Sequence, residues 1–162
     1  MIDEIDTRIL TILHKNARTP NSEIARKIGM APSAILERIR KLEEKGVIRG
    51  YTVSLDPAAL DLATLAYILV RTRDGCWQGD TGEKLAAFPE VEEVHHIAGE
   101  DCFLIKVRAK DTNALGALLR DRFTEIDSIG ATRTTIVLET VKEARGIAVP
   151  SRAARKKSKG AP

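Results

Sequence analysis

Hydrophobic residues recur at helical spacing in three stretches of the first fifty residues. The first stripe comprises Ile5, Ile9, Ile12 and Leu13. The second comprises Ile24, Ala25 and Ile28, and the third Ile35, Leu36, Ile39 and Leu42. Asp3 can cap the first helix and Pro20 favours the start of the second, whereas Gly29 and Gly46 favour helix ends. The pattern therefore predicts three short helices.

The second and third predicted helices are separated by only a few residues, and the third is basic. Two short helices joined by a glycine-containing turn are typical of a helix-turn-helix, here over about residues 20–44. Residues 47–51 then predict a short strand, as in a wing. Together, residues 1–52 are expected to form a winged helix-turn-helix DNA-binding domain.

The third helix supplies the candidate DNA contacts. With its apolar stripe facing inward, we expect Ala34, Arg38 and Lys41 to face outward, with Ser33 and Glu37 beside them. Small residues let the backbone approach base edges, and Arg or Lys can reach guanine or phosphate. Arg40, Lys45 and Arg49 are better placed for the DNA backbone. The predicted DNA-binding residues are Ser33, Ala34, Glu37, Arg38, Arg40, Lys41 and Arg49. A surface helix with solvated charges remains the alternative on periodicity alone.

The second half of the chain has the pattern of an α+β domain. After a linker over residues 53–62, strands are expected at 65–70, 91–98, 102–109 and 132–139. One helix is expected before Pro89 and another after Asp111. This β-α-β-β-α-β order is that of a ferredoxin-like fold, which we assign to residues 63–143. Two helices cover only one face of the sheet. The mixed polarity of the other face is compatible with pairing in a homodimer or with a lone domain.

Composition narrows the class of protein. Hydrophobic residues make up 43% and charged residues 30%, a composition that allows a packed core and does not indicate a disordered chain. The longest apolar run, residues 62–70, is about half of a membrane span. The two cysteines have neither metal-ligand spacing nor the density of a disulfide scaffold. We expect no membrane association, no secretory signal, and a cytoplasmic, nucleoid-associated location.

Charge is unevenly distributed along the chain. Residues 1–52 carry a net charge of +3, residues 53–149 one of −5, and residues 150–162 one of +5. This division suggests that an anionic polymer such as double-stranded DNA meets the ends rather than the middle. The basic tail, 150–162, has no apolar periodicity and is expected to be disordered. It either adds nonspecific DNA affinity or is simply solvated.

A series of short motifs carries a family resemblance. In the first domain they are Asp3-x-x-Asp6-x-x-Ile9-Leu10, Glu23-Ile24-Ala25-x-x-Ile28-Gly29, Pro32-Ser33-x-x-x-x-Arg38-Ile39 and Leu42-Glu43-x-x-Gly46-Val47-Ile48-x-Gly50-Tyr51. Further along are Leu55-Asp56-Pro57, Gly99 and Thr132-Arg133-Thr134. Over residues 2–143 the chain resembles the Lrp/AsnC, or feast–famine, transcriptional regulators. The resemblance implies a winged helix-turn-helix and a ligand-sensing ferredoxin-like (RAM) domain. It also implies dimerisation through that second domain, further assembly, and effectors that are usually amino acids.

The same resemblance implies an effector site near the turn before the third strand. The residues that it suggests are Gly99, Glu100, Asp101, Cys102, Thr132 and Thr134. The sequence departs from the family here, because the usual acid falls on Cys102, and Asp101 or Glu100 is expected to substitute for it from a neighbouring position. The glycine-containing stretch 76–82 also departs from the helix start expected there.

No catalytic or metal-binding constellation is readable in the sequence, and no cofactor is expected. His95 and His96 are adjacent on a predicted strand, so they point to opposite faces and cannot jointly hold one metal. We expect a DNA-binding regulator rather than an enzyme. Two alternatives remain open: a siroheme-decarboxylase-like enzyme on the same architecture, and an architectural DNA binder without an effector.

Overall fold

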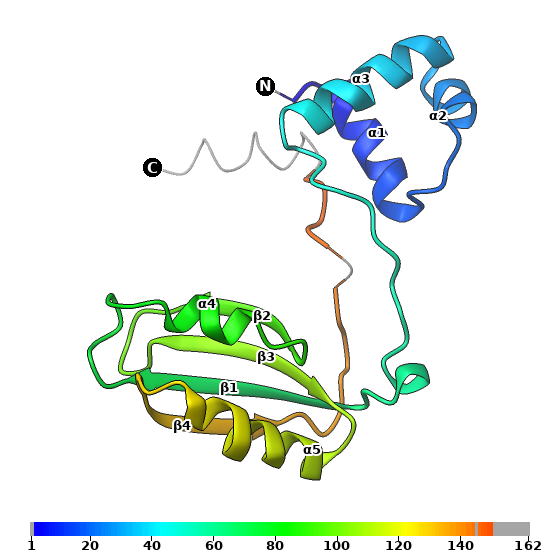
Figure 1. Cartoon of the computed structure of the whole chain (residues 1–162). Helices are drawn as coiled ribbons and strands as arrows, with labels where there is room; N and C mark the ends of the chain where they lie inside the picture. The colour runs from blue at the N-terminus through cyan, green and yellow to red at the C-terminus, as the bar shows by residue number, and fades with distance from the viewer. Residues whose placement is uncertain (1, 145, 151–162) are drawn as a thin grey trace, which may run out of the picture. The chain divides into compact units, whose positions relative to one another are not determined.

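The structure, a computed structural model, describes residues 2–144 and 146–150. The chain divides into two compact units, which we describe separately (Figure 1). Among the described residues, the helical unit contains the chain up to Ser54 and the segment from Glu143 to Pro150, and the sheet unit is Leu55–Lys142. None of the helices in the described ranges is both long and apolar enough to span a membrane. The expected tail lies outside the described residues, except for Pro150.

Three helices form the helical unit: α1 (Glu4–Lys15), α2 (Asn21–Ile28) and α3 (Pro32–Glu44). The side chain of Asp3 accepts from the amide of Asp6, and the side chain of Asp6 accepts from the amide of Asp3. This reciprocal capping box satisfies amides that have no partner inside α1. The apolar stripes of the three helices face one another, and their buried members are Ile9, Leu13, Ile24, Ala25, Ile35, Ile39 and Leu42. Leu36, which was expected in the third stripe, is instead exposed. The three predicted helices are thus confirmed.

A tight turn joins α2 to α3. Gly29 adopts a left-handed conformation (φ +82°) and its amide donates to the carbonyl of Ala25. A side chain would be strained at this φ, so glycine allows the chain to reverse here. Pro32 then occupies the start of α3, where its missing amide costs nothing.

The strand predicted at residues 47–51 is not formed, so this expectation was wrong. The amides of Val47 and Ile48 both donate to the carbonyl of Leu42 and thereby close the end of α3. β-branched residues indicate a strand only where a partner strand lies alongside. Residues 47–52 instead line a hollow of about 710 Å³ together with α1 and residues 146–150. Because residues 146–150 line this hollow, the segment after Lys142 belongs to the helical unit. The sequence pattern did not predict this return of the chain.

The sheet unit has the predicted β-α-β-β-α-β order. Its strands are β1 (Thr64–Thr72), β2 (Val91–His96), β3 (Phe103–Ala109) and β4 (Ile129–Ile136). Its helices are α4 (Thr81–Ala86) and α5 (Thr112–Ala117), the latter continued by the turns η2 (Leu118–Arg122) and η3 (Phe123–Glu125). One further short helix, η1 (Ala58–Leu60), lies in the segment predicted as a linker, most of which belongs to the sheet unit. The strands are antiparallel in the order β2-β3-β1-β4, as in a ferredoxin-like fold.

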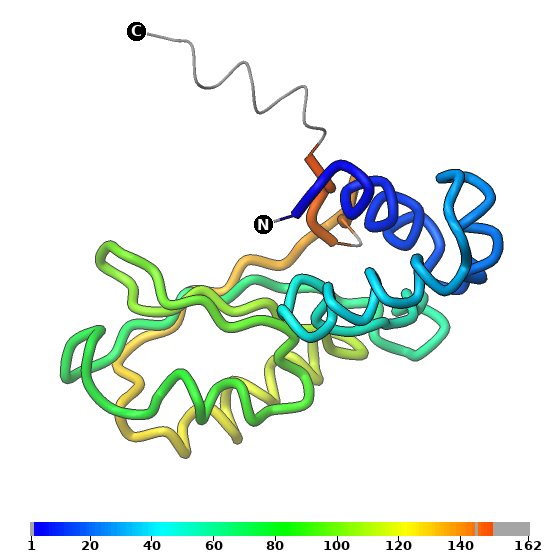
Figure 2. The backbone as a smooth tube through the Cα atoms, turned by 90° about the horizontal axis from the view of Figure 1, so that it is seen from above, coloured from blue at the N-terminus to red at the C-terminus, as the bar shows by residue number. Residues whose placement is uncertain are grey.

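Both helices lie on one face of the sheet (Figure 2). On that face Ile68, Ile105 and Val107 are fully buried with Leu115 and Phe123 from the helical segments. This is the alternation expected for an antiparallel sheet with one face on the core. The fourth strand begins three residues earlier than predicted, because Ile129 pairs with Thr72 beyond a register shift in β1.

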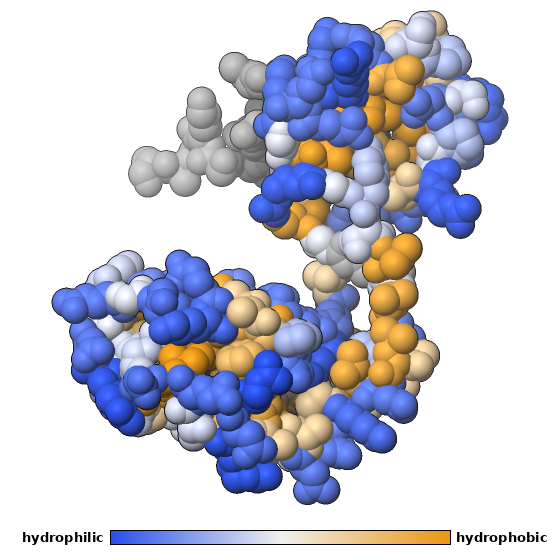
Figure 3. All heavy atoms as spheres, in the orientation of Figure 1, coloured by the Kyte–Doolittle hydropathy of each residue, from blue (hydrophilic) through white to orange (hydrophobic). Residues whose placement is uncertain are grey.

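The helix-free face of the sheet is mixed, as the alternation along the strands predicts. Tyr67 of β1 lies opposite Lys106 of β3 on this face. The Nζ of Lys106 lies 3.0 Å from an oxygen of Glu92, and the Nε of Arg108 lies 2.8 Å from its other oxygen. Hydrophilic side chains cover most of the visible surface of each unit (Figure 3).

Candidate functional sites

The exposed side of α3 carries most of the predicted DNA-binding residues. Ser33, Glu37, Arg40 and Lys41 are exposed, and Ala34 at the edge of this face is half-buried. Counting 100° per residue from the buried Ile35 places these side chains on the side opposite the core. The face is therefore centred on Glu37 and Arg40 rather than on Arg38.

Both exposed cations of this face are held by glutamates one turn away. The Nε of Arg40 lies 3.2 Å from Glu44, and the Nζ of Lys41 lies 3.3 Å from Glu37. The side chains of Arg40 and Lys41 are 71% and 58% exposed. Ion pairs at such exposure contribute only about 0–1 kcal/mol, so a phosphate group can replace the glutamate at little cost.

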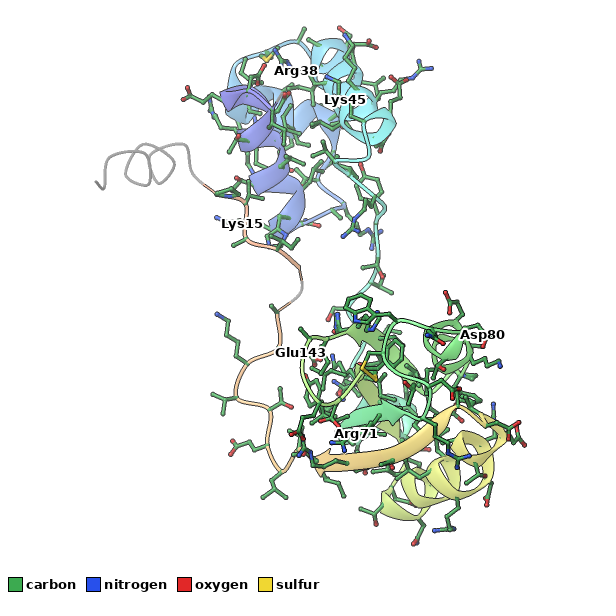
Figure 4. The ribbon with its side chains drawn as sticks, turned by 90° about the vertical axis from the view of Figure 1, so that its left-hand side faces the viewer. Lys15, Arg38, Lys45, Arg71, Asp80 and Glu143 are labelled. Atoms are coloured by element: carbon green, nitrogen blue, oxygen red, sulfur yellow. A yellow bond between two sulfur atoms is a disulfide. The ribbon has the colours of Figure 1, made fainter. Side chains whose placement is uncertain are left out.

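The outward direction predicted for Arg38 is wrong. One nitrogen of its guanidinium donates to Asp3 at 2.6 Å and to Asp6 at 2.8 Å (Figure 4). The side chain is only 29% exposed. Arg38 sits three residues after Ile35, at the flank of the buried stripe, and this flank faces the start of α1. It therefore fixes the orientation of α3 against the capping box of α1.

These contacts also shift the acid–base equilibrium of Asp3. The amide of Asp6 and then the guanidinium of Arg38 stabilise the ionised carboxylate, so the pKa of Asp3 lies below its ordinary value. The sequence contained a signal for this contact, because Asp3, Asp6 and Arg38 all belong to the motifs that carry the family resemblance. Periodicity alone does not indicate that they meet.

Arg49 is exposed and lies beyond the end of α3, in the segment that closes the helix. The structure thus places six of the seven predicted residues at or beside one exposed face or just after it, with Arg38 turned inward. Among the described residues no group of three or more His, Cys, Asp or Glu could hold a metal ion.

The second candidate site is the turn between β2 and β3, residues 99–101. Gly99 adopts a φ of +139°, which disfavours any other residue. Asp101 accepts from Arg133 of β4 at 2.8 Å, and its other oxygen lies 3.7 Å from Arg71 at the end of β1. Glu100 accepts from Arg71 at 3.2 Å. The acidic turn is therefore paired with two arginines, Arg133 and Arg71. Arg71 is labelled in Figure 4.

The predicted threonines do not lie on the same face as these charges. Thr132 lies opposite Val70 and Thr134 opposite Ile68, so both belong to the face that the helices cover. Arg133 between them points to the opposite, helix-free face because side chains alternate along a strand. Sequence reasoning missed Arg71 and Arg133. The sequence offered a signal for Arg133, because it lies between Thr132 and Thr134, which were predicted as effector-binding residues.

Cys102 differs most from its predicted role. Only 1% of its surface is exposed, and its sulfur forms a disulfide with Cys76. Its amide donates to the carbonyl of Val70 and its sulfur lies 3.2 Å from the hydroxyl of Thr72. In this form Cys102 is not a direct partner for the ammonium group of a ligand.

The two units define the class of protein: a helix-turn-helix DNA-binding unit joined to an α+β sensor domain. The family model described as winged helix-turn-helix DNA-binding matches residues 2–49. The model described as the Lrp/AsnC ligand binding domain matches residues 65–147. The chain belongs to the Lrp/AsnC family of transcriptional regulators. It is a DNA-binding regulator and not an enzyme, which removes the decarboxylase alternative.

Relatives support this assignment over nearly the whole chain. The HTH-type transcriptional regulator FL11 of Pyrococcus horikoshii is 40% identical over 142 residues, which cover 88% of this chain and 93% of the relative. The leucine-responsive regulatory protein of Salmonella typhimurium is 33% identical, with 93% of each chain covered. A feast or famine regulatory protein from M. tuberculosis, solved in complex with L-methionine, is 31% identical with a TM-score of 0.85. That comparison covers 93% of this chain and 100% of the solved one.

The Asp3–Arg38 contact predicts a pH-dependent contribution to stability. Because folding lowers the pKa of Asp3, the stabilisation is present above the ordinary pKa of 3.8 and is lost as the pH falls through the folded value. The Asp3→Asn variant keeps a capping side chain but loses the charge. At pH 7 it should be less stable than the parent by less than about 1 kcal/mol, since the pair is partly exposed.

Urea unfolding followed by circular dichroism at pH 7, 5, 3 and 2 measures this difference. The difference between Asp3→Asn and the parent should shrink toward zero at pH 2. Glu4→Gln, which changes an exposed carboxyl in the first turn of the same helix, is the control. A difference that stays constant across this pH range would contradict the proposed linkage.

Proposed function

We propose that the exposed face of α3 lies in the major groove of double-stranded DNA and reads a roughly palindromic site. Ser33, Ala34 and Glu37 lie nearest the base edges, while Arg40 and Lys41 contact base edges or phosphates. One observation carries this proposal: Arg40 and Lys41 are exposed on α3, the third helix of the domain that matches the DNA-binding model. Each is paired with an exposed glutamate of the same helix. Arg49 adds a phosphate contact.

Arg38 has a different role in this proposal. Its guanidinium holds α3 against α1, so it positions the reading face rather than contacting a base. Because chromosomal DNA is the partner, we also propose that the protein acts in the cytoplasm, associated with the nucleoid. Residues 151–162 carry a strongly basic sequence, and they would add to DNA affinity through charge alone.

Charge-removing variants test the DNA contacts. After selection of bound fragments from genomic DNA, Arg40→Ala and Lys41→Ala should each weaken binding to the selected site. A lost base contact should cost about 1–3 kcal/mol and relax the sequence preference, whereas a lost phosphate contact should lower the salt slope by about 1. Gel-shift titrations at several salt concentrations measure both effects.

The matched control is Lys84→Ala, because Lys84 is also an exposed lysine paired one turn away, with Asp80 of the sheet unit. It should leave DNA affinity unchanged. Glu37→Gln should strengthen nonspecific binding slightly, because it removes the carboxylate that competes with DNA for Lys41. Unchanged affinity in the Arg40 and Lys41 double variant would show that this face does not contact DNA.

We also propose that a free amino acid binds beside the turn 99–101 and modulates the regulator. The relative from M. tuberculosis is complexed with L-methionine, which makes L-methionine the first effector to test. An amino acid carries both an ammonium and a carboxylate group. Asp101 and Glu100 suit the ammonium group, and Arg71 and Arg133 suit the carboxylate.

Calorimetry with L-methionine and the other amino acids tests this site. Asp101→Asn should weaken binding about tenfold or more, since a hydrogen bond to a charged group contributes roughly 1.5–3 kcal/mol. Glu100→Gln should have a smaller effect, because Glu100 is almost fully exposed. Asp127→Asn, on the exposed segment before β4, is the control.

Two results would overturn the effector proposal. Equal heats in the parent and in both turn variants would place the ligand elsewhere. No heat from any amino acid would favour the remaining alternative, a DNA binder that needs no effector.

The helix-free face of the sheet is proposed to pair in a homodimer or larger assembly. Tyr67 and Val137 lie on this face and are only partly covered in a single chain. Val137→Asp would bury an unpaired charge in the pairing surface, so light scattering should report smaller particles than for the parent. The same substitution at Val141, which is 91% exposed, should leave the mass unchanged. An unchanged mass for folded Val137→Asp would exclude this pairing surface.

A further inference from the structure

The disulfide joins two loops at one end of the sheet. Cys76 lies in the loop between β1 and α4, and Cys102 directly follows the acidic turn and precedes β3. Their Cα atoms are 4.7 Å apart, although 26 positions separate them in the sequence. The disulfide is visible as a yellow bond in Figure 4. It belongs to no part of the DNA-binding or effector chemistry derived above.

Hydrogen bonds hold the two cysteines near each other independently of the covalent bond. The amide of Cys102 donates to the carbonyl of Val70 at 2.8 Å, which fixes Cys102 beside β1. The hydroxyl of Thr72 donates to the carbonyl of Gly75 at 2.8 Å, which turns the chain so that Cys76 faces Cys102. Gly75 has a φ of +88°, and this conformation allows the turn. Reduction would therefore leave the two thiols positioned to form the bond again.

The two sulfurs differ in accessibility. Cys102 is buried, whereas Cys76 is half-buried in a loop whose neighbouring Trp77 is largely exposed. Because the single proton of the Thr72 hydroxyl goes to Gly75, a reduced Cys102 thiol would donate to the Thr72 oxygen. Cys76 is thus the thiol that meets a reagent from solution.

We propose that Cys76 and Cys102 form a reversible thiol–disulfide pair that responds to oxidants and alters the effector turn. A regulator that works beside DNA in the cytoplasm works in a reducing compartment, where disulfides are usually transient and redox-sensing rather than structural. The half of the proposal that concerns the effector turn rests on the effector site proposed above.

The oxidant is a hydroperoxide, and the reaction proceeds in two balanced steps. The Cys76 thiolate attacks the peroxide, the O–O bond breaks, and Cys76 becomes a sulfenic acid with release of hydroxide or alkoxide. The Cys102 sulfur then attacks the Cys76 sulfur, the S–O bond breaks, and water leaves with the proton of Cys102. Overall, two thiols lose two electrons to the peroxide oxygen. A small dithiol or protein dithiol reverses the reaction by exchange at Cys76.

The bond affects the effector turn because Asp101 is the residue before Cys102. Oxidation joins Cys102, and with it the turn, to the loop at 73–80. Glycines at 75 and 79 make the backbone of this loop conformationally permissive. Trp77 of that loop contacts His96 of β2 at a ring distance of 4.3 Å, and His96 stacks on Phe103 at 4.8 Å. Reduction removes the covalent restraint between the loop and the turn, while these ring contacts, the Thr72 bond and the bond from the Arg73 amide to the carbonyl of Ser128 remain. The turn keeps its hydrogen bonds to β1 and β4 but loses one restraint, and a ligand must then supply that part of the order on binding, so the reduced form should bind its effector more weakly.

Thiol counting and the fluorescence of Trp77, the single tryptophan, test the redox pair without any effector. The full chain reduced with dithiothreitol should show both cysteines as free thiols under denaturing conditions. Treatment with hydrogen peroxide should remove both, with no cross-linked dimer on a non-reducing gel, and dithiothreitol should restore them. Trp77 emission should fall on oxidation, because a disulfide quenches an adjacent indole.

The Cys76→Ser variant is the matched control for this experiment. It should keep its one buried thiol under the same peroxide treatment and show no fluorescence response. Two thiols that persist in the folded parent after peroxide, or oxidation only between chains, would overturn the proposal. So would an equal fluorescence response in Cys76→Ser. If the variant does not fold, thiol counts of the parent after reduction, oxidation and renewed reduction still test the proposal.

Calorimetry with L-methionine on the oxidised and reduced parent tests the coupling. The reduced form should bind about threefold or more weakly, and Cys76→Ser should match the reduced form in both conditions. Equal affinity in the two forms would overturn the coupling while the effector site stands. If neither form binds L-methionine or another amino acid, the effector proposal fails and the coupling fails with it. Thiol counting would still decide the redox pair.

Discussion

The double pairing of β1 is the interaction on which the sheet unit and its candidate site both depend. β1 hydrogen-bonds to β3 on one side and β4 on the other, and its residues Ala66, Ile68 and Val70 are fully buried. The end of the strand then serves three purposes. The carbonyl of Val70 holds Cys102, the hydroxyl of Thr72 organises the loop before α4, and Arg71 reaches the acidic turn. The turn is ordered because a buried central strand leaves these groups little freedom.

The helical unit depends in a similar way on the fixed position of one side chain. The helix-turn-helix packs through aliphatic stripes, which set distances between helices but resist rotation of a helix only weakly. Arg38 adds a directional contact from α3 to two carboxylates that also cap α1. Arg38 thereby helps to keep Arg40 and Lys41, on the proposed DNA-binding face of α3, turned outward. Its charge is already neutralised, so it contributes little to the field that DNA meets.

The helices and the order of the strands could be predicted from the sequence, whereas contacts between residues far apart in the chain could not. The three helices and the β-α-β-β-α-β order follow from hydrophobic spacing, because burial of one face imposes that spacing. The predicted strand at 47–51 failed because those amides close α3 instead. The contacts of Asp101 with Arg71 and Arg133 depend on the register of β1, β3 and β4, which no single segment encodes. The pairing of Cys76 with Cys102 likewise depends on strand order, because 26 positions separate the two residues.

In the free protein, both candidate sites hold their charges in compensated pairs. Arg40 and Lys41 are neutralised by glutamates on α3, and Asp101 is neutralised by Arg133. A ligand therefore binds by replacing the existing ion-pair partners. The binding free energy is then the difference between the contacts with the ligand and the ion pairs that it displaces. At the turn a simple anion would take the arginines and leave Asp101 without a partner, and a simple cation would do the reverse. A zwitterion can satisfy the acid and the arginines together. At α3 the displaced glutamates are exposed to water, so a polyanion alone suffices. This difference in exposure distinguishes the proposed small-molecule site from the proposed DNA-binding surface.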